Sequence, residues 1–209
     1  MHRAIKTTSI LLLVSTILFG QETNQSTLDK KVQTFLKENK SKWRDLNVPY
    51  EDGQVLHDLI VKNKYKSALE IGTSTGHSTI WIAWALSKTG AKLGTIEIDE
   101  ERRKEALNNL KAVGLSEFVD ARLADAHELV KSLNGPFDFV FSDADKGWYT
   151  QYFKDLEPKL SVAGCFTPHN VNNNFTGIRE FMEYVHSQKN FETSLAGLDD
   201  GISVSYKRK

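Results

Sequence analysis

Residues 68–78 decide the fold of this chain, and they read Ala68-Leu69-Glu70-Ile71-Gly72-Thr73-Ser74-Thr75-Gly76-His77-Ser78. A short apolar run ends in an acidic residue, passes through a Gly-x-x-x-Gly turn, and then enters an apolar-periodic helix. Strand, tight turn and helix N-terminus in this order form the arrangement in which α/β folds hold nucleotide-like ligands. The alternative is a purely structural turn. The spacing differs from the Gly-x-Gly-x-x-Gly pattern of dinucleotide-binding folds.

The residue types in this turn favour a ligand that carries a nucleoside, a carboxylate and an amino group. Gly72 and Gly76 allow the backbone to approach a ligand closely, because glycine has no Cβ. A helix N-terminus attracts a carboxylate as well as a phosphate, and Glu70 at the strand end suits an amino group. S-adenosylmethionine carries all three groups, so we expect it to be the ligand.

Further carboxylates follow three later apolar runs. Glu97 ends the second run, Asp125 follows the third, and Asp143 ends the fourth. The carboxyl ends of parallel strands meet at the edge of a sheet where ligands bind, and an acid at the end of the second strand can accept hydrogen bonds from ribose hydroxyls. We therefore expect these residues to line one ligand site.

The order of elements predicts an α/β fold. Strand-like and helix-like segments alternate, which is typical of a Rossmann-like, doubly wound and mostly parallel sheet, here of seven strands. The last two apolar runs cover residues 191–195 and 202–206, with Asp199-Asp200-Gly201 between them as a turn. This hairpin is expected to add one antiparallel strand at the C-terminus.

From about residue 49 to its C-terminus, the chain resembles the catechol and caffeoyl-CoA type of S-adenosylmethionine-dependent O-methyltransferases, including their bacterial relatives. The motifs that carry the resemblance are Glu51-Asp52-Gly53-Gln54, Leu69-Glu70-Ile71-Gly72, Thr95-Ile96-Glu97, Asp143-Ala144-Asp145-Lys146, Tyr149, His169-Asn170-Val171 and Asp200-Gly201. The resemblance implies methyl transfer from S-adenosylmethionine to a hydroxyl of a small, catechol-like aromatic acceptor.

The resemblance also implies roles for individual residues. The residues expected to bind the methionine part of the cofactor are Glu70, Gly72, Ser74, Gly76 and Ser78. Glu97 would bind the ribose, and Asp125 and Ala126 would lie beside the adenine. Asp143 would contact both the cofactor and a divalent metal, and Lys146 would be the general base.

One position departs from the family pattern. The family usually has Asp-Asn after its fifth strand, and this chain has His169-Asn170. Because Mg²⁺ prefers oxygen ligands, a set made of Asp143, His169 and Asn170 suits Mn²⁺, Fe²⁺, Zn²⁺ or Ni²⁺ better. The sequence predicts a transition metal if any metal binds. The alternative is that His169 forms local hydrogen bonds and no metal binds.

The composition is typical of one globular domain. The 209 residues are 40% hydrophobic and 26% charged, with a formal net charge of zero. A chain of this length forms one core rather than two, and the balanced charge argues against a nucleic-acid partner. The single cysteine, Cys165, lies in an apolar run and excludes a disulfide within the chain.

The N-terminus is predicted to be a signal peptide covering residues 1–20. Arg3 and Lys6 precede an apolar run at residues 9–20, which is shorter than the roughly 20 apolar residues of a transmembrane helix. We therefore expect export to the periplasm or the medium and no stable membrane span. If the leader does not function, the protein is cytoplasmic.

Residues 21–48 are predicted to hold a polar segment and a helix, before a methyltransferase domain at 49–209. Residues 21–27 are polar and are expected to be disordered, and residues 28–43 show amphipathic helical spacing. In relatives, such helices close the substrate site or form a homodimer. Two other functions remain open: a nucleotide-dependent oxidoreductase, and an exported binding protein that keeps the fold without catalysis.

Overall fold

The computed structural model describes residues 24–43 and 46–209, so the predicted signal peptide lies outside the described residues. Within those two ranges, no helix is both long and apolar enough to cross a membrane. The chain divides into two compact units, one ending at Asn39 and the other covering Lys40–Lys209. The second unit contains the sheet and the candidate site.

The first unit contains a helix at residues 24–38. The expectation of disorder at residues 21–27 is therefore wrong for residues 24–27, which form the first turn of this helix. The side chain of Gln25 donates a hydrogen bond to Asp29 Oδ1 at 3.1 Å, and polar pairs four residues apart stabilise a helix. The helix also ends earlier than the amphipathic spacing predicted.

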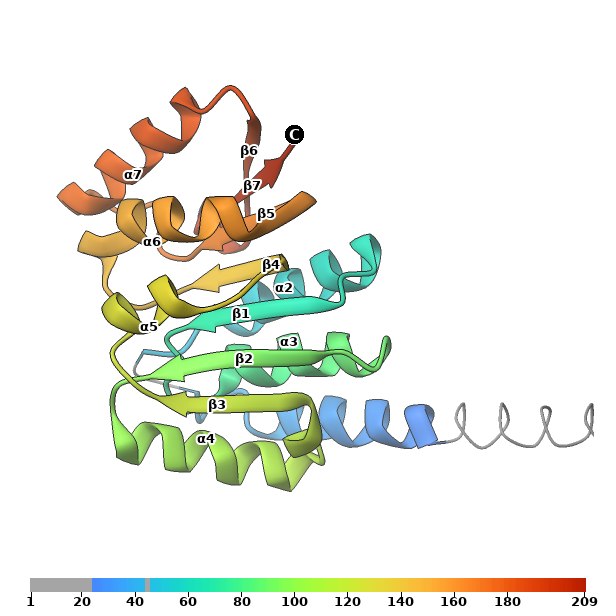
Figure 1. Ribbon diagram of the computed structural model, residues 1–209. Helices are drawn as coiled ribbons and strands as arrows, with labels where there is room; N and C mark the ends of the chain where they lie inside the picture. The colour runs from blue at the N-terminus through green and yellow to red at the C-terminus, as the bar shows by residue number, and fades with distance from the viewer. Residues whose placement is uncertain (1–23, 44–45) are drawn as a thin grey trace, which may run out of the picture. The chain divides into compact units, whose positions relative to one another are not determined.

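A seven-stranded sheet forms the centre of the second unit (Figure 1). Its strands are β1 (Ser67–Ile71), β2 (Lys92–Glu97), β3 (Val119–Leu123), β4 (Phe137–Ser142), β5 (Leu160–Pro168), β6 (Phe191–Ala196) and β7 (Ile202–Lys207). The strand order is β3-β2-β1-β4-β5-β7-β6. All neighbouring strands pair in parallel except β7, which is antiparallel to both β5 and β6. The predicted doubly wound sheet with one antiparallel hairpin strand is confirmed.

Helices cover both faces of the sheet. They are α2 (Tyr50–Asn63), α3 (His77–Ser87), α4 (Glu100–Val113), α5 (Ala126–Ser132), α6 (Tyr149–Leu156) and α7 (Thr176–Ser187). One buried cluster joins α2 and α3 to the sheet through residues such as Leu56, Ile82 and Phe139. The other cluster joins α5, α6 and α7 to the opposite face, as Val130 and Phe153 show. α2, α5, α6 and α7 therefore bury an apolar side against the sheet, whereas every residue of α3 is buried.

The strand order reverses between β1 and β4, and this reversal positions the site. β1 pairs with β2 on one side and with β4 on the other. The chain therefore continues from β1 toward one edge of the sheet and from β4 toward the opposite edge. The arrowheads of β1 to β4 all point toward the left in Figure 1. Just beyond them, the Asp143 amide donates a hydrogen bond to the Ile71 carbonyl at 2.8 Å. Ligands bind at such a switch point in open α/β sheets.

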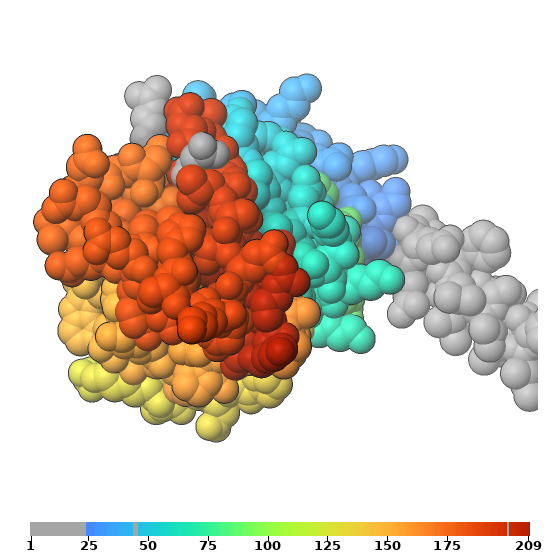
Figure 2. Space-filling model, turned by 90° about the horizontal axis from the view of Figure 1, so that it is seen from above, coloured from blue at the N-terminus to red at the C-terminus, as the bar shows by residue number. Residues whose placement is uncertain are grey.

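The C-terminal strands return to this edge beside α2. In the view from above, the red segment of β6 and β7 borders the cyan segment of α2 (Figure 2). Ile202 of β7 lies in the same buried cluster as Leu56 of α2 and pairs with His169 through an isolated antiparallel bridge. The end of β5 is thus placed between α2 and the C-terminal hairpin.

Candidate functional site

The turn after β1 requires glycine at two positions. Gly72 and Gly76 have φ values of 96° and 95°, which L-residues with a side chain rarely adopt. A Cβ on Gly72 would lie 2.8 Å from the Asp143 carbonyl oxygen. The turn therefore lies directly against the loop after β4.

Glu70 lies under this turn and is fully buried. Its carboxylate accepts hydrogen bonds from the hydroxyls of Ser78, Thr79 and Thr95, each at 2.6 Å. Burial raises the pKa of Glu70 to about 7, although the three hydroxyls act in the opposite direction. Glu70 and Ser78 thus hold the turn to the start of α3.

Glu97 lies at the end of β2 and fixes the other side of the turn. Its Oε2 accepts a hydrogen bond from the Ser74 amide at 2.7 Å, and its Oε1 accepts bonds from the Ile98 and Asp99 amides at 3.0 Å. A carboxylate has about four acceptor positions, so these three bonds leave some capacity for a ligand hydroxyl.

Two adjoining cavities open at this edge of the sheet. The first, which we call the Lys146 cavity, has a volume of about 430 Å³ and is lined by Gly72, Ser74, Glu97, Asp143, Lys146 and His169, together with Asn170. The second, the His127 cavity, has a volume of about 260 Å³ and shares Gly72 and Glu97 with the first. Its other lining residues include Asp125, Ala126 and His127. Cavities of this size suit small-molecule ligands.

The His127 ring forms a wall of its cavity. It stacks on Trp148 with ring centroids 3.8 Å apart and planes 14° apart. Its two ring nitrogens lie 3.6 Å from Asp125 Oδ1 and 3.4 Å from Asp145 Oδ2. Asp125 is the N-cap of the helix that contains His127, whereas Asp145 and Trp148 come from the segment after β4 and are brought to His127 by the fold.

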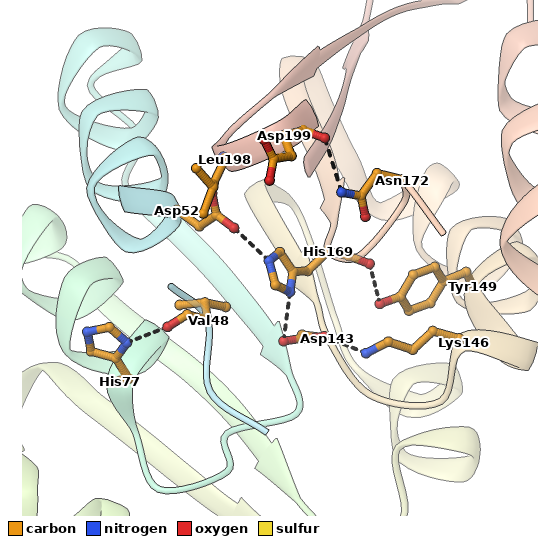
Figure 3. A network of polar contacts seen from close by, with 10 residues as sticks. All are labelled: Val48, Asp52, His77, Asp143, Lys146, Tyr149, His169, Asn172, Leu198 and Asp199. Carbon is orange, nitrogen blue, oxygen red and sulfur yellow. Dashed lines mark hydrogen bonds and ion pairs between the residues drawn. The ribbon is translucent and has the colours of Figure 1, made fainter. Parts of the chain in front are cut away.

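Four charged side chains are linked in a row (Figure 3), and three of them line the Lys146 cavity. The Lys146 ammonium donates a hydrogen bond to Asp143 Oδ1 at 2.5 Å. His169 Nδ1 lies 3.2 Å from Asp143 Oδ2, and His169 Nε2 lies 2.8 Å from Asp52 Oδ2. The order of the chain is therefore Asp52, His169, Asp143 and Lys146.

His169 bridges two carboxylates with its two ring nitrogens. An ionised carboxylate only accepts hydrogen bonds, so both nitrogens must donate and the ring is an imidazolium. Burial alone would lower the pKa of His169, but the hydrogen bonds and charges of Asp143 and Asp52 outweigh burial and raise it to about 9. His169 is thus a buried cation between two anions.

Asp52 is a site residue that sequence reasoning missed. It is 1% exposed on α2, and its Oδ1 accepts a hydrogen bond from the Leu198 amide at 2.5 Å. A Cβ on Gly197 would lie 2.6 Å from the same oxygen. The Glu51-Asp52-Gly53-Gln54 motif was the signal, but its partners lie in the C-terminal hairpin and were not predictable from spacing.

Tyr149 stabilises the site from the protein interior. Tyr149 is one of the residues that carry the sequence resemblance. Its ring is fully buried, and its hydroxyl donates a hydrogen bond to the His169 carbonyl at 2.9 Å. Tyr149 therefore holds the backbone at His169 and belongs to the core.

The described geometry corresponds to a known family. The sequence signature of O-methyltransferases matches residues 21–207. The chain belongs to the O-methyltransferase family. Catechol O-methyltransferase of Niastella koreensis is 39% identical over 113 residues, which cover 52% of this chain and 51% of that protein. Caffeoyl-CoA O-methyltransferase 1 of Eucalyptus globulus is 32% identical over 130 residues, which cover 60% of this chain and 52% of that protein. The chain thus spans about half the length of these relatives.

Solved O-methyltransferase structures share the fold. The Bacillus cereus enzyme in complex with SAH has a TM-score of 0.71 and 26% identity, and the match covers 88% of this chain and 91% of that one. TomG of Streptomyces achromogenes in complex with SAM has a TM-score of 0.70 and 25% identity, with coverage of 87% and 89%. The resemblance seen in the sequence is confirmed.

The structure brings most of the predicted O-methyltransferase site together. Gly72, Ser74, Glu97, Asp143 and Lys146 line the Lys146 cavity with His169 and Asn170. Asp125 and Ala126 line the His127 cavity. Glu70 and Ser78 are bonded to each other under the turn, and Gly76 is the N-cap of α3. These last three residues shape the turn, and their contact with a cofactor stays a prediction.

The predicted metal ligands do not fit a divalent cation. Among residues 24–43 and 46–209, no group of three His, Cys, Asp or Glu side chains is arranged to hold a metal. Both nitrogens of His169 face carboxylates, and both oxygens of Asp143 face cationic groups. To bind a metal, His169 would have to lose a ring proton and its hydrogen bond to a carboxylate, and the Lys146 ammonium already neutralises Asp143. The donor set thus argues against the expected transition-metal site.

Proposed function

We propose that this protein transfers a methyl group from S-adenosylmethionine to a hydroxyl of a small aromatic acceptor. The observation that carries the proposal is the position of the Lys146–Asp143 ion pair, which lines the same cavity as the Gly72 turn and Glu97. The residues proposed to bind the nucleoside and the pair proposed to exchange a proton thus lie at the same edge of the sheet. The catechol and caffeoyl-CoA O-methyltransferases named among the relatives support an aromatic acceptor.

The cavity walls fit S-adenosylmethionine. Gly72 and Glu97 line the same cavity, and the remaining acceptor capacity of Glu97 suits ribose hydroxyls. The His127 cavity continues from Glu97 past Asp125 and Ala126, and we assign it to the adenine. When bound, S-adenosylmethionine supplies an electrophilic methyl group on its sulfonium.

Lys146 and Asp143 provide the acid–base chemistry. Methyl transfer requires an acceptor oxygen that has lost its proton, and a positioned side chain can take it. We assign proton uptake to the Lys146 amine. Asp143 then binds the resulting ammonium, and the ion pair at 2.5 Å corresponds to this protonated state. The two groups also orient the acceptor oxygen, which reduces the entropic cost of reaction.

The direct test is transfer of an isotope-labelled methyl group from S-adenosylmethionine to a panel of catechols and hydroxycinnamoyl esters. The full chain is expected to label at least one phenol, at a rate that falls 10²-fold or more in Lys146→Met. Cofactor binding without transfer to any hydroxylated acceptor would instead favour a non-catalytic binding protein.

Export through residues 1–20 is a separate proposal. Its support is the apolar run at residues 9–20 behind Arg3 and Lys6. Expression of the full chain in a bacterial host, followed by N-terminal sequencing of the extracellular or periplasmic fraction, tests it. A mature protein that begins near residue 21 is expected, and an intact N-terminus found only inside the cell would contradict export.

A further inference from the structure

The acceptor side of the Lys146 cavity contains an internal cation at the position where the family pattern has a metal-binding aspartate. His169 replaces that aspartate. Its ring is 5% exposed and lies between Asp143 Oδ2 at 3.2 Å and Asp52 Oδ2 at 2.8 Å. A carboxylate ligand has thus become a positive group that joins two carboxylates.

We propose that the Asp52–His169–Asp143 bridge takes the place of the divalent metal in this O-methyltransferase. The inference rests on the proposed function, since it names what organises the acceptor end of the same site. His169 is a positioning residue here. It holds Asp143, and Asp143 in turn holds Lys146.

The donor atoms support this proposal. A histidine binds a metal through the lone pair of a deprotonated ring nitrogen. In this structure each ring nitrogen of His169 faces a carboxylate oxygen, so each must carry a proton. Metal binding would have to remove one of these protons and break the hydrogen bond that it forms.

Charge balance leads to the same conclusion. With Lys146 protonated, the cluster contains two carboxylates, Asp52 and Asp143, and two cations, His169 and Lys146. A divalent cation would add two positive charges to a neutral and partly buried cluster, which is unfavourable. The family pattern of two carboxylates and one amide contains no histidine cation to neutralise a carboxylate.

The bridge is also fixed at its far end. The second oxygen of Asp52 accepts the Leu198 amide hydrogen bond at 2.5 Å, and Tyr149 holds the His169 carbonyl at 2.9 Å. Each partner is therefore held by a hydrogen bond from another element, Asp52 by the Leu198 amide and His169 by the Tyr149 hydroxyl. A rigid pair of this kind can keep Asp143 in one orientation, as a metal ion would.

Metal binding, measured without any assay of activity, tests the proposal. The full chain is titrated into Mn²⁺, and free Mn²⁺ is followed by electron paramagnetic resonance, with and without S-adenosylhomocysteine. The wild-type chain is expected to leave the Mn²⁺ signal unchanged up to 1 mM protein. The double variant Asp52→Asn/His169→Asp restores two carboxylates beside Asn170, and at the same protein concentration it is expected to lower the free Mn²⁺ signal at least tenfold.

A second variant covers the case in which the double variant does not fold. The single variant His169→Gln removes the cation and keeps a neutral polar side chain that can still donate to Asp52, so the Asp143 oxygen opposite Lys146 becomes available to Mn²⁺. Micromolar Mn²⁺ binding by wild type that His169→Gln abolishes would overturn the proposal. Folded variants that bind no more Mn²⁺ than wild type would also overturn it.

Activity provides an independent comparison. Methyl transfer by the wild-type chain should stay within twofold when EDTA replaces added Mg²⁺ or Mn²⁺, and a loss of more than tenfold in EDTA would contradict the proposal. If no condition gives transfer, the proposed function fails. The Mn²⁺ titrations still decide the role of His169, because they do not depend on turnover.

Discussion

His169 Nε2 donates a hydrogen bond to Asp52 Oδ2 over 2.8 Å, although the two residues are 117 positions apart in the chain. Asp52 lies on α2 before the first strand, and His169 follows the fifth. Both side chains are almost fully buried. The pair therefore ties the beginning of the domain to the edge where the acceptor is proposed to bind (Figure 3).

Replacing Asp52 should destabilise the protein strongly. Asp52→Ala removes one of the two carboxylates that hold the buried imidazolium, and breaking a buried ion pair costs about 3–5 kcal/mol. Urea unfolding followed by circular dichroism measures the loss. Asp58→Ala on the same helix is the matched control, since Asp58 has a side chain 65% exposed and should change stability by less than about 1 kcal/mol. Equal effects of the two substitutions would contradict the assigned role of Asp52.

His169 makes the stability depend on pH in the alkaline range. Its pKa is about 9 in the folded protein, against 6.5 as the ordinary value. The folded state therefore binds more protons than the unfolded state between these values, so stability is complete below pH 6.5 and falls as pH rises through 9. Urea midpoints measured from pH 6 to 9.5 should decrease for wild type and change less for His169→Gln. Parallel curves would argue against an imidazolium.

The Gly72 turn should not tolerate a side chain. Gly72→Ala combines a φ of +96° with a Cβ placed 2.8 Å from the Asp143 carbonyl oxygen. Gly90→Ala is the matched control, because Gly90 has a φ of +70° with open space around its Cβ. The control should lose about 1–2 kcal/mol from its backbone conformation alone, measured by urea unfolding. Gly72→Ala should lose more and should bind S-adenosylhomocysteine at least tenfold more weakly, and equal behaviour would contradict the close packing of the turn.

Lys146 should affect catalysis rather than cofactor binding. Lys146→Met removes the proposed base, so kcat should fall by roughly 10²–10⁴-fold, with little change in the Kd for S-adenosylhomocysteine. Steady-state kinetics and calorimetry separate the two effects. Lys131→Met, at an exposed pair with Glu128, is the control and should keep wild-type kcat. Full activity of Lys146→Met would show that another group takes the proton.

The sequence predicted the sheet and the gathering of the Gly72 turn and the strand-end acids at one edge well, because both depend on local patterns. The strand–turn–helix at Gly72 and the acids after each strand are readable from neighbouring residues and from parallel topology. The bridge at His169 was not predictable, since it needs the C-terminal hairpin to bring the Leu198 amide and Gly197 against Asp52. The sequence offered a metal ligand or local hydrogen bonds as interpretations of His169, and neither included its distant partner Asp52 for that reason. A histidine between two distant carboxylates is recognised only once the fold places them.

Calorimetric titration of the full chain with S-adenosylmethionine, in EDTA and without added metal, tests the central claim most directly. The account predicts a single site with a Kd near 1 μM, which corresponds to about −8 kcal/mol, and at least tenfold weaker binding by Glu97→Ala. A folded wild-type chain that shows no binding at millimolar cofactor would contradict the methyltransferase assignment.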